Sequence, residues 1–335
     1  MKNLIFILLF AGSLWLGFGC SDVKKTNATT PISVIFDTDM GPDFDDVGAL
    51  TLLHAFADSG EVRILATLSS NTDSLSAPCI DVINTYYGRP DLPIGAPLKG
   101  VNIGDGHPVK WTEALVAKFP HNLKSTSDAP DAVGIYRKIL AAEPDTSVVI
   151  ITVGFLTNLA NLLESMPDSL SPLTGRELVT AKVKRLVSMA GSFPSGWEFN
   201  VQSDSAASVK VFSEWPSPVL FSGFEIGDKI LTGKRLIASD IADTPAKETF
   251  TVCLKQGDFD GRQSWDESTV LVAVRGAEPY FNTARGCIIV NSNGSNAWQD
   301  DPQGTHEHLT WKLPPDELAK IIEDRMMYVG VDKKE

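Results

Sequence analysis

The chain has 335 residues, of which 43% are hydrophobic, and its formal net charge is −13. This is the composition of a globular protein, long enough for one large domain or two small ones. The acidic balance argues against a nucleic-acid partner, because phosphate backbones are bound by clustered Lys and Arg.

The N-terminus has the features of an export signal. A short basic start precedes an apolar run, residues 4–18, and Cys20 follows closely. This order is typical of a secretory signal, and the cysteine resembles the lipidated cysteine of bacterial lipoproteins. A simple membrane anchor is the alternative, but the run is short for a spanning helix. We therefore expect residues 1–20 to be a signal peptide with Cys20 lipidated, and residues 21–31 to be a flexible tether. The mature protein would be exported, and lipid-anchored at the periplasmic face or in the outer membrane.

The rest of the chain alternates apolar segments with helical patterns. The predicted strands are residues 33–36, 62–68, 147–153, 183–189, 218–223 and 285–290. The predicted helices are residues 45–57, 77–87, 132–142, 158–163, 205–212, 266–274 and 315–327. Strands that are apolar throughout indicate a sheet covered on both faces. We predict one α/β domain over residues 32–335, with an open, mostly parallel central sheet and helices on both faces.

Five aspartates crowd the segment after the first predicted strand: Asp37, Asp39, Asp43, Asp45 and Asp46. Carboxylates this close repel one another unless a cation compensates. A hard divalent ion is the natural candidate, because calcium takes about six to eight oxygen ligands. Capping of the helix expected near residue 45 explains one or two of the five, but not Asp37 and Asp39, which leave the strand. The spacing also fails to match an EF-hand, because Gly48 stands at the twelfth position instead of Glu.

Polar residues also follow the later strands. Asn71, residues 154–158 and residues 190–200 each come after a predicted strand. Ligands of open α/β sheets bind beyond the carboxyl ends of the strands. We therefore expect these polar segments to converge on one rim with the aspartates.

Four segments together carry a family resemblance. Residues 37–50, DTDMGPDFDDVGAL, resemble the D-x-D-x-G-x-D-D signature of the inosine-uridine-preferring nucleoside hydrolase family. Residues 153–163 resemble its G-x-L-T-N segment, residues 189–207 its Met-Gly-Gly…Glu-Phe-Asn…Asp segment, and residues 264–274 its His-Asp helix. Each match alone is weak, but four in the same order identify the chain as a member. The resemblance implies calcium-dependent hydrolysis of the N-glycosidic bond of ribonucleosides, giving free base and ribose.

The resemblance also implies roles for individual residues. In the family, one calcium ion at the bottom of the pocket holds the attacking water and two ribose hydroxyls. By resemblance, four residues are calcium ligands: Asp39, Asp46, Val153 through its backbone carbonyl, and Asp266. Asp39 would also be the catalytic base that takes the water's proton. Asp45 would bind a ribose hydroxyl, and Asp37 would support the calcium ligands from behind.

Four further residues match the family's sugar-contacting positions: Asn71, Met189, Glu198 and Asn200. Glu198 and Asn200 are two apart, so they share a face if the segment is extended. Asn71 could instead be a turn residue, and Met189 could be core packing. The two tryptophans beside assigned positions, Trp197 and Trp265, are expected in the core rather than against the substrate.

The chain departs from the family pattern in two places. Its aspartate loop is two residues longer, so Asp43 is an extra carboxylate that could replace Asp45, add to the coordination or face solvent. In addition, the family's leaving-group histidine is Trp265 here. The alternative acids outside the expected helices are His107, His121, His306 and His308, whereas His54 is expected to be packed. The H-x-H at residues 306–308 is interpreted as a surface or rim segment rather than a metal pair, and it could edge the pocket.

Two alternatives to nucleoside hydrolysis stay open. One is hydrolysis of another N- or O-linked furanoside on the same fold, which the longer loop and Trp265 allow. The other is a non-catalytic, calcium-dependent sugar-binding lipoprotein, against which the retained Asp39 argues. In every case the expected ligand is a small riboside, and a homo-oligomer is compatible with the sequence.

Overall fold

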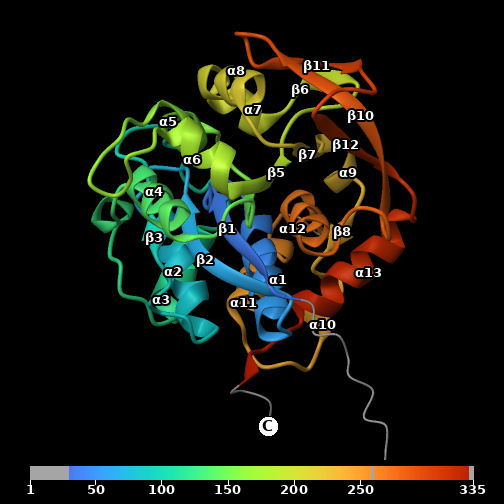
Figure 1. Cartoon of the computed structure of the whole chain (residues 1–335). Coiled ribbons are helices and arrows are strands. Elements are labelled where there is room, and N and C mark those ends of the chain that lie inside the picture. The colour runs from blue at the N-terminus through green and yellow to red at the C-terminus, as the bar shows by residue number, and fades with distance from the viewer. Residues whose placement is uncertain (1–29, 258–259, 332–335) are drawn as a thin grey trace, which may run out of the picture. The chain divides into compact units, whose positions relative to one another are not determined.

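The computed structural model describes residues 30–257 and 260–331. Figure 1 shows them coloured along the chain. The described residues from Pro31 onward belong to one compact unit. The expected signal peptide, the lipidated Cys20 and nearly all of the expected tether lie outside the described residues. Within the described ranges, no helix is both long enough and apolar enough to cross a membrane.

A large central sheet organises the fold. Its strands are β1 Ile32–Thr38, β2 Val62–Ser69, β3 Ile94–Gly95, β4 Val148–Thr152, β5 Val183–Met189, β6 Ser195–Trp197, β7 Val219–Ser222, β10 Phe281–Val290, β11 Ser295–Asp300 and β12 His306–Trp311. Their order is β3-β2-β1-β4-β5-β7-β12-β10-β11-β6. The strands from β3 to β12 pair in parallel, and β10, β11 and β6 continue the sheet antiparallel. The prediction of an open, mostly parallel sheet is confirmed.

Helices cover both faces of this sheet. They are α1 Asp45–Asp58, α2 Ser76–Tyr86, α3 Trp111–Lys118, α4 Ala132–Ala142, α5 Thr157–Glu164, α6 Gly175–Lys182, α7 Phe199–Ser203, α8 Ser205–Glu214, α9 Phe224–Gly227, α10 Lys234–Ala238, α11 Pro245–Leu254, α12 Trp265–Arg275 and α13 Pro315–Met326. One core contains α1, α2, α11, α12 and α13, and the other contains α4, α5, α6 and α8. Central strands serve both cores, because successive side chains point to opposite faces. In β1, Val34 and Phe36 enter the first core and Ile35 enters the second.

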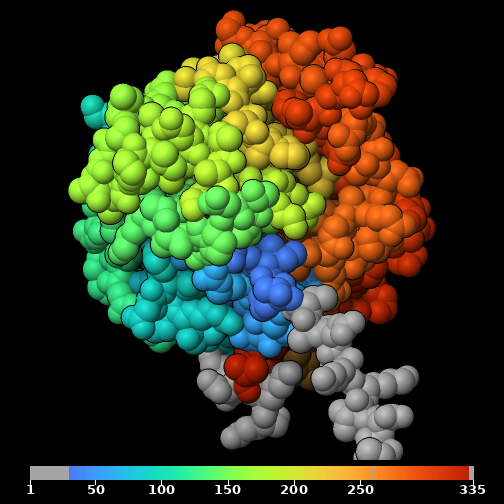
Figure 2. Space-filling model, in the orientation of Figure 1, coloured from blue at the N-terminus to red at the C-terminus, as the bar shows by residue number. Residues whose placement is uncertain are grey.

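The strand order of the sheet reverses at β1, and this reversal determines where the site lies. β1 pairs with β2 on one side and with β4 on the other, both in parallel. A crevice forms at the carboxyl ends of strands where the connections leave in opposite directions. Asp39 follows β1 and Val153 follows β4, so both stand at this crevice. Figure 1 shows α1 beside α12. On the face drawn in Figure 2, the dark blue start of the described chain is visible as a small central patch.

The C-terminal part of the sheet differs from the sequence prediction. Residues 285–290 were expected to be buried in a parallel sheet, but β10 is antiparallel to both neighbours and partly exposed. The expectation that residues 306–308 form a surface or rim segment is wrong, because they begin β12, which lies between β7 and β10. His306 is 6% exposed and its Nδ1 accepts a hydrogen bond from the Ile288 amide at 3.2 Å. His308 is half-buried and its ring stacks on Phe193.

Candidate active site

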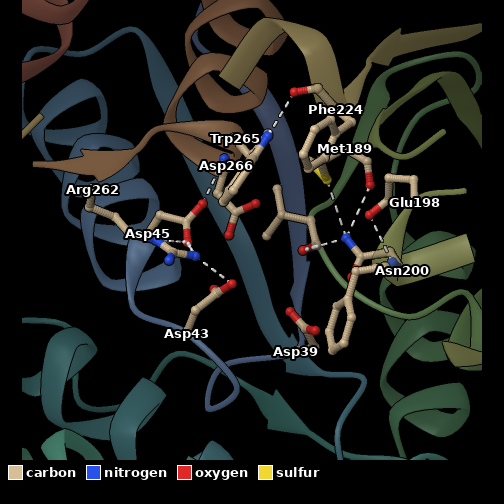
Figure 3. A pocket seen from close by; sticks show the side chains of 12 residues that line it. Asp39, Asp43, Asp45, Met189, Glu198, Asn200, Phe224, Arg262, Trp265 and Asp266 are labelled. Carbon is tan, nitrogen blue, oxygen red and sulfur yellow. Dashed lines mark hydrogen bonds and ion pairs between the residues drawn. The ribbon is translucent and has the colours of Figure 1, made fainter. Parts of the chain in front are cut away.

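A cavity of about 270 Å³ lies at the carboxyl ends of β1, β4 and β5. Figure 3 shows Asp43, Asp45 and Arg262 on one side of it and Met189, Glu198 and Asn200 on the opposite side. Its lining residues are Asp39, Asp43, Asp45, Val153, Met189, Glu198, Phe199, Asn200, Phe224, Arg262, Trp265 and Asp266. Eight of these residues were singled out from the sequence for metal or substrate binding, and the fold brings them to one place from four separate segments.

Asp39 is held at the cavity by close backbone packing. Its carbonyl oxygen accepts a hydrogen bond of 3.1 Å from the Asn71 side chain. Gly154 lies against it so tightly that an added Cβ would stand 2.3 Å from the Asp39 amide nitrogen and 2.5 Å from Ser70 Oγ. The glycine after Val153 is therefore required by the approach of β4's end to β1's end.

Asp46 lies directly behind the cavity wall and is fully buried. Thr38 donates a hydrogen bond to its Oδ1, whereas its Oδ2 has no hydrogen-bond partner. Burial and then the charge of Asp43 raise the pKa of Asp46 to about 7, although Thr38, Arg262 and Asp266 lower it. A buried carboxylate oxygen without a donor is costly, so Asp46 Oδ2 indicates a missing positive partner.

The pKa values of two other acidic groups, Asp39 and Asp266, are raised by the same causes. Burial raises the pKa of Asp39 well above its usual range, and the charges of Asp46, Asp43 and Asp45 raise it further. The pKa of Asp266 is raised by burial first and then by Asp45 and Asp46. Clustered carboxylates become fully charged only when a cation offsets their repulsion.

The donor set fits a hard divalent cation. Among the described residues, no three His, Cys, Asp or Glu side chains already stand in the arrangement of a metal site. However, Asp39, Val153 and Asp266 line the cavity and the buried Asp46 has an orphaned carboxylate oxygen, so the carboxylates and the Val153 carbonyl offer only oxygen donors. Oxygen donors of mixed denticity are the ligands of calcium and magnesium rather than of zinc.

Arg262, on the short strand β9 Arg262–Gln263, is a cavity residue that the sequence motifs do not indicate. Its Nε and one Nη donate to Asp45 Oδ1 at 3.0 and 2.9 Å, and it forms an ion pair with Asp43. Its guanidinium carbon lies 5.1 Å from the ring centres of both Phe44 and Trp265. The only signal in the sequence is a basic residue four positions before Asp266.

The two aspartates beside Arg262 therefore have different surroundings. Asp45 is 1% exposed, and its second oxygen accepts a 3.4 Å hydrogen bond from the Asp266 amide. The Asp43 side chain is 41% exposed and pairs with Arg262 at the mouth of the cavity. The extra carboxylate of the longer loop is thus placed beside an arginine, an arrangement that was not among the three sequence-based alternatives.

The opposite wall is built by Glu198 and Asn200. Glu198 caps α7 by accepting hydrogen bonds from the amides of Asn200, Val201 and Gly191 at 2.8, 3.1 and 3.1 Å. Burial raises the pKa of Glu198 to about 7, although these amides lower it. The capping contact turns the carboxylate toward its own helix, while the Asn200 side chain reaches the ends of β4 and β5.

Aromatic rings close the remaining side of the cavity. Phe199, Phe224 and Trp265 line it, and Trp265 Nε1 donates to the Phe224 carbonyl oxygen at 2.8 Å. The expectation that Trp265 is a core residue is confirmed only in part, because its partly buried side chain packs against the core and also lines the cavity. Trp197 was also expected in the core, but it lies on the short edge strand β6 and is 60% exposed.

Besides Asp46, two further predicted site residues, Asp37 and Asn71, do not line the cavity. Asp37 accepts hydrogen bonds from Tyr136 Oη at 2.8 Å and from Asn158 Nδ2 at 3.1 Å, and burial raises its pKa to about 7. Asn71 Nδ2 donates to the carbonyl oxygens of Asp39 and Ile103. The structure thus places Asp37 and Asn71 as braces of the aspartate loop.

No histidine of the described residues lines the cavity. His54 is fully buried in α1, where its Nε2 lies 3.0 Å from Asn84 Oδ1, so the expectation that it is packed is confirmed. The four other candidate acids, His107, His121, His306 and His308, are not among the lining residues.

Carboxylates and flat aromatic rings that line one cavity suit a particular class of reaction. Negative charge stabilises an oxocarbenium-like sugar, and aromatic walls hold a flat leaving group. The fold and the cavity together define a hydrolase of small glycosides at the switch point of an open α/β sheet.

Comparisons with known proteins identify the family. The model of the inosine-uridine preferring nucleoside hydrolase family matches residues 34–306. The chain belongs to this family, and it is an N-glycosidase that hydrolyses the glycosidic bond of nucleosides. No curated protein matches the chain.

Solved structures show the same fold. An inosine-guanosine nucleoside hydrolase is 23% identical, with a TM-score of 0.65 over 88% of this chain and 98% of that one. A purine-preferring ribonucleoside hydrolase from Gardnerella vaginalis is 16% identical, with a TM-score of 0.65 over 88% and 96%. An inosine-uridine preferring nucleoside hydrolase from Bacillus anthracis is 15% identical, with a TM-score of 0.62 over 88% and 99%.

Proposed function

We propose that this protein is a calcium-dependent hydrolase of ribonucleosides in which Asp39 is the catalytic base. The observation that carries the proposal is the pairing of Asp39, on the cavity wall, with the orphaned Oδ2 of Asp46 directly behind it. An oxygen-only donor set of this kind favours calcium. The products are the free base and ribose.

Asp39, Asp46, Asp266 and the Val153 carbonyl would hold the cation. When bound, calcium supplies a positive charge that polarises and orients a water molecule, although it lowers the water's pKa only weakly. Asp39 therefore takes a proton from the attacking water. At the same time the oxygen of that water bonds to C1′, and the bond from C1′ to the base nitrogen breaks. The electron pair leaves with the base, which gains a proton at that nitrogen.

The two other sides of the cavity orient the substrate. Asn200 and Glu198 line the cavity on the side opposite Asp45, and sugar hydroxyls bound there would share the Glu198 carboxylate with the backbone amides that it already accepts. Phe224 and Trp265 offer flat surfaces to the leaving base. Since no histidine of the described chain lines the cavity, we infer that solvent entering the cavity supplies the proton to the base.

A direct assay tests the proposal. Purified protein is incubated with inosine, guanosine, adenosine, uridine and cytidine, in calcium chloride or with a chelator, and released base and ribose are quantified. The proposal expects release from at least one nucleoside that is lost with chelator and restored by calcium. Release from synthetic furanosides alone would favour the broader furanosidase. Calcium-dependent ribose binding without any release would favour the sugar-binding lipoprotein.

The site of action follows from the N-terminal sequence. We propose that the protein is exported and anchored by lipid on Cys20, which would give it access to nucleosides outside the cytoplasm. Labelling with a radioactive fatty acid and cell fractionation test this. Cys20→Ala should lose the label and leave the membrane fraction, whereas Cys287→Ala should behave as the wild type. A labelled Cys20→Ala protein would contradict lipidation at this residue.

A further inference from the structure

We infer that Arg262 is a positioning residue whose guanidinium serves as a permanent counter-ion. It fixes the Asp45 carboxylate, while the other carboxylates of the site remain to bind the cation. The inference rests on the proposed function, because it assumes a cation at Asp39, Asp46 and Asp266. It also gives the longer aspartate loop a purpose, since Asp43 reaches the same guanidinium.

The first support is the geometry of the contact. Both Nε and Nη2 of Arg262 donate to a single oxygen, Asp45 Oδ1, at 3.0 and 2.9 Å. Charge-assisted contacts of this kind are about twice as strong as neutral hydrogen bonds and fix orientation. The second oxygen of Asp45 accepts from the Asp266 amide, so the contact also links the aspartate loop to the start of α12.

The second support is that the guanidinium itself is held. It lies between the rings of Phe44 and Trp265, each centre 5.1 Å away, and the Arg262 side chain is only 11% exposed. A stacked, planar group is not interchangeable with a flexible lysine ammonium. Arg262 therefore sets the position of Asp45 and one face of the Trp265 ring together.

The third support is electrostatic. Asp45 and Asp43 are held by a fixed positive charge, whereas Asp46 Oδ2 has no partner. The single positive charge of Arg262 thus offsets one of these two negative charges, and the attraction for an external cation is strongest at the carboxylates that have no such partner.

Three variants separate the charge of Arg262 from its geometry. Arg262→Met removes both, Arg262→Lys keeps the charge, and Arg275→Met is the matched control. Arg275 also makes two contacts to one acidic side chain, Glu61, at 2.8 Å each, and lies 4.8 Å from the Phe56 ring, but at the other end of α12. Calcium affinity is measured by titration calorimetry without substrate, and kcat and KM with the best nucleoside of the panel.

The expected results follow from the two roles. Arg262→Met should bind calcium at least about threefold more tightly, because a nearby positive charge is gone, yet lose at least about tenfold in kcat. Arg262→Lys should keep the wild-type calcium affinity but recover only part of kcat. Arg275→Met should match the wild type in both. Weaker calcium binding by Arg262→Met, or unchanged kcat, would overturn the inference.

Failure of the proposed function would be recognised separately. If the wild type releases no base, the calcium titrations still decide whether Arg262 is a counter-ion. If the wild type binds no calcium, the contact between Arg262 and Asp45 is tested by a double-mutant cycle of Arg262→Met with Asp45→Asn. The melting temperatures of the four proteins are measured in chelator. The inference expects the double variant to be at least about 3 °C more stable than the two single effects predict. Additive effects would overturn it.

Discussion

Asn200 Nδ2 donates a 3.2 Å hydrogen bond to the backbone carbonyl oxygen of Val153, which lies 47 residues earlier in the chain. The same nitrogen lies 3.2 Å from the Met189 carbonyl oxygen and 3.3 Å from Met189 Sδ. One amide group thus joins the ends of β4 and β5 at the cavity. A carbonyl oxygen has two lone pairs, so Val153 can accept this hydrogen bond and still face the proposed cation.

Asn200→Asp tests this junction with almost no change in shape. A carboxylate oxygen would face two carbonyl oxygens, and we expect the free energy of unfolding to fall by about 3 kcal/mol. Asn161→Asp is the control, because Asn161 is exposed on α5 and should change stability by less than about 0.5 kcal/mol. Urea unfolding measures both. Equal stability of the two variants would mean that Asn200 does not make the junction.

Gly154→Ala tests the close approach to Asp39. The new Cβ would stand 2.3 Å from the Asp39 amide nitrogen, so the loop must shift, and we expect kcat to fall at least about 100-fold. Gly134→Ala is the control, because nothing lies within 4 Å of its new Cβ. That change lies in α4 and should stabilise the protein by about 0.5–1 kcal/mol. Wild-type kcat in Gly154→Ala would refute the requirement for glycine.

Asp39→Asn tests the catalytic base. The amide keeps the size and one oxygen donor but cannot take the proton from water, so we expect kcat to fall by about 100- to 10,000-fold. Affinity for ribose or a nucleoside, measured by calorimetry, should change much less. Asp145→Asn, with its side chain 77% exposed, should leave both quantities unchanged. Equal losses of turnover and affinity by Asp39→Asn would point to a structural role.

His54 predicts acid sensitivity of the fold. Burial and the charge of Arg89 lower the pKa of His54 from 6.5 to about 3, so the unfolded chain binds a proton that the folded chain does not. The groups facing it are Arg89, Asn84, Tyr87 and, by charge, Asp58. Its contribution is therefore present above pH 6.5 and is lost as the pH falls toward 3, by about 1.4 kcal/mol per pH unit.

The variant His54→Gln removes the titrating group but can keep a hydrogen bond to Asn84. We expect it to be less stable than the wild type at pH 7.5, with a smaller loss of stability between pH 6.5 and 5. The measurement is the free energy of unfolding in urea at pH 7.5, 6.5 and 5. Parallel pH profiles for the two proteins would show that His54 does not carry the acid sensitivity. His121→Gln, at a half-buried loop position, is the control.

Sequence alone determined the strand–helix alternation and the order of the acidic motifs. Segments such as β1 and β4 are mainly apolar on both faces, because both faces of the strand are buried, and this leaves a clear local pattern. The positions of Asp39 and Val153 at strand ends follow from the same pattern. The place of Glu198 and Asn200 at the cavity was predicted from the family resemblance. The local pattern could not supply it, since the segment begins a short helix and is not a strand.

Only the tertiary structure decided which side chains face one another. Arg262 meets Asp45 across 217 residues of chain, and no local pattern encodes that contact. Trp265 opens a helix whose residues after it are buried, so its ring could point into the core or into the cavity. The pairing of β12 with β7 and β10 likewise depends on strands distant in sequence, which bury His306 and half-bury His308. Burial and partner choice are set by the packing of the whole chain, whereas strand and helix patterns are set by neighbours along it.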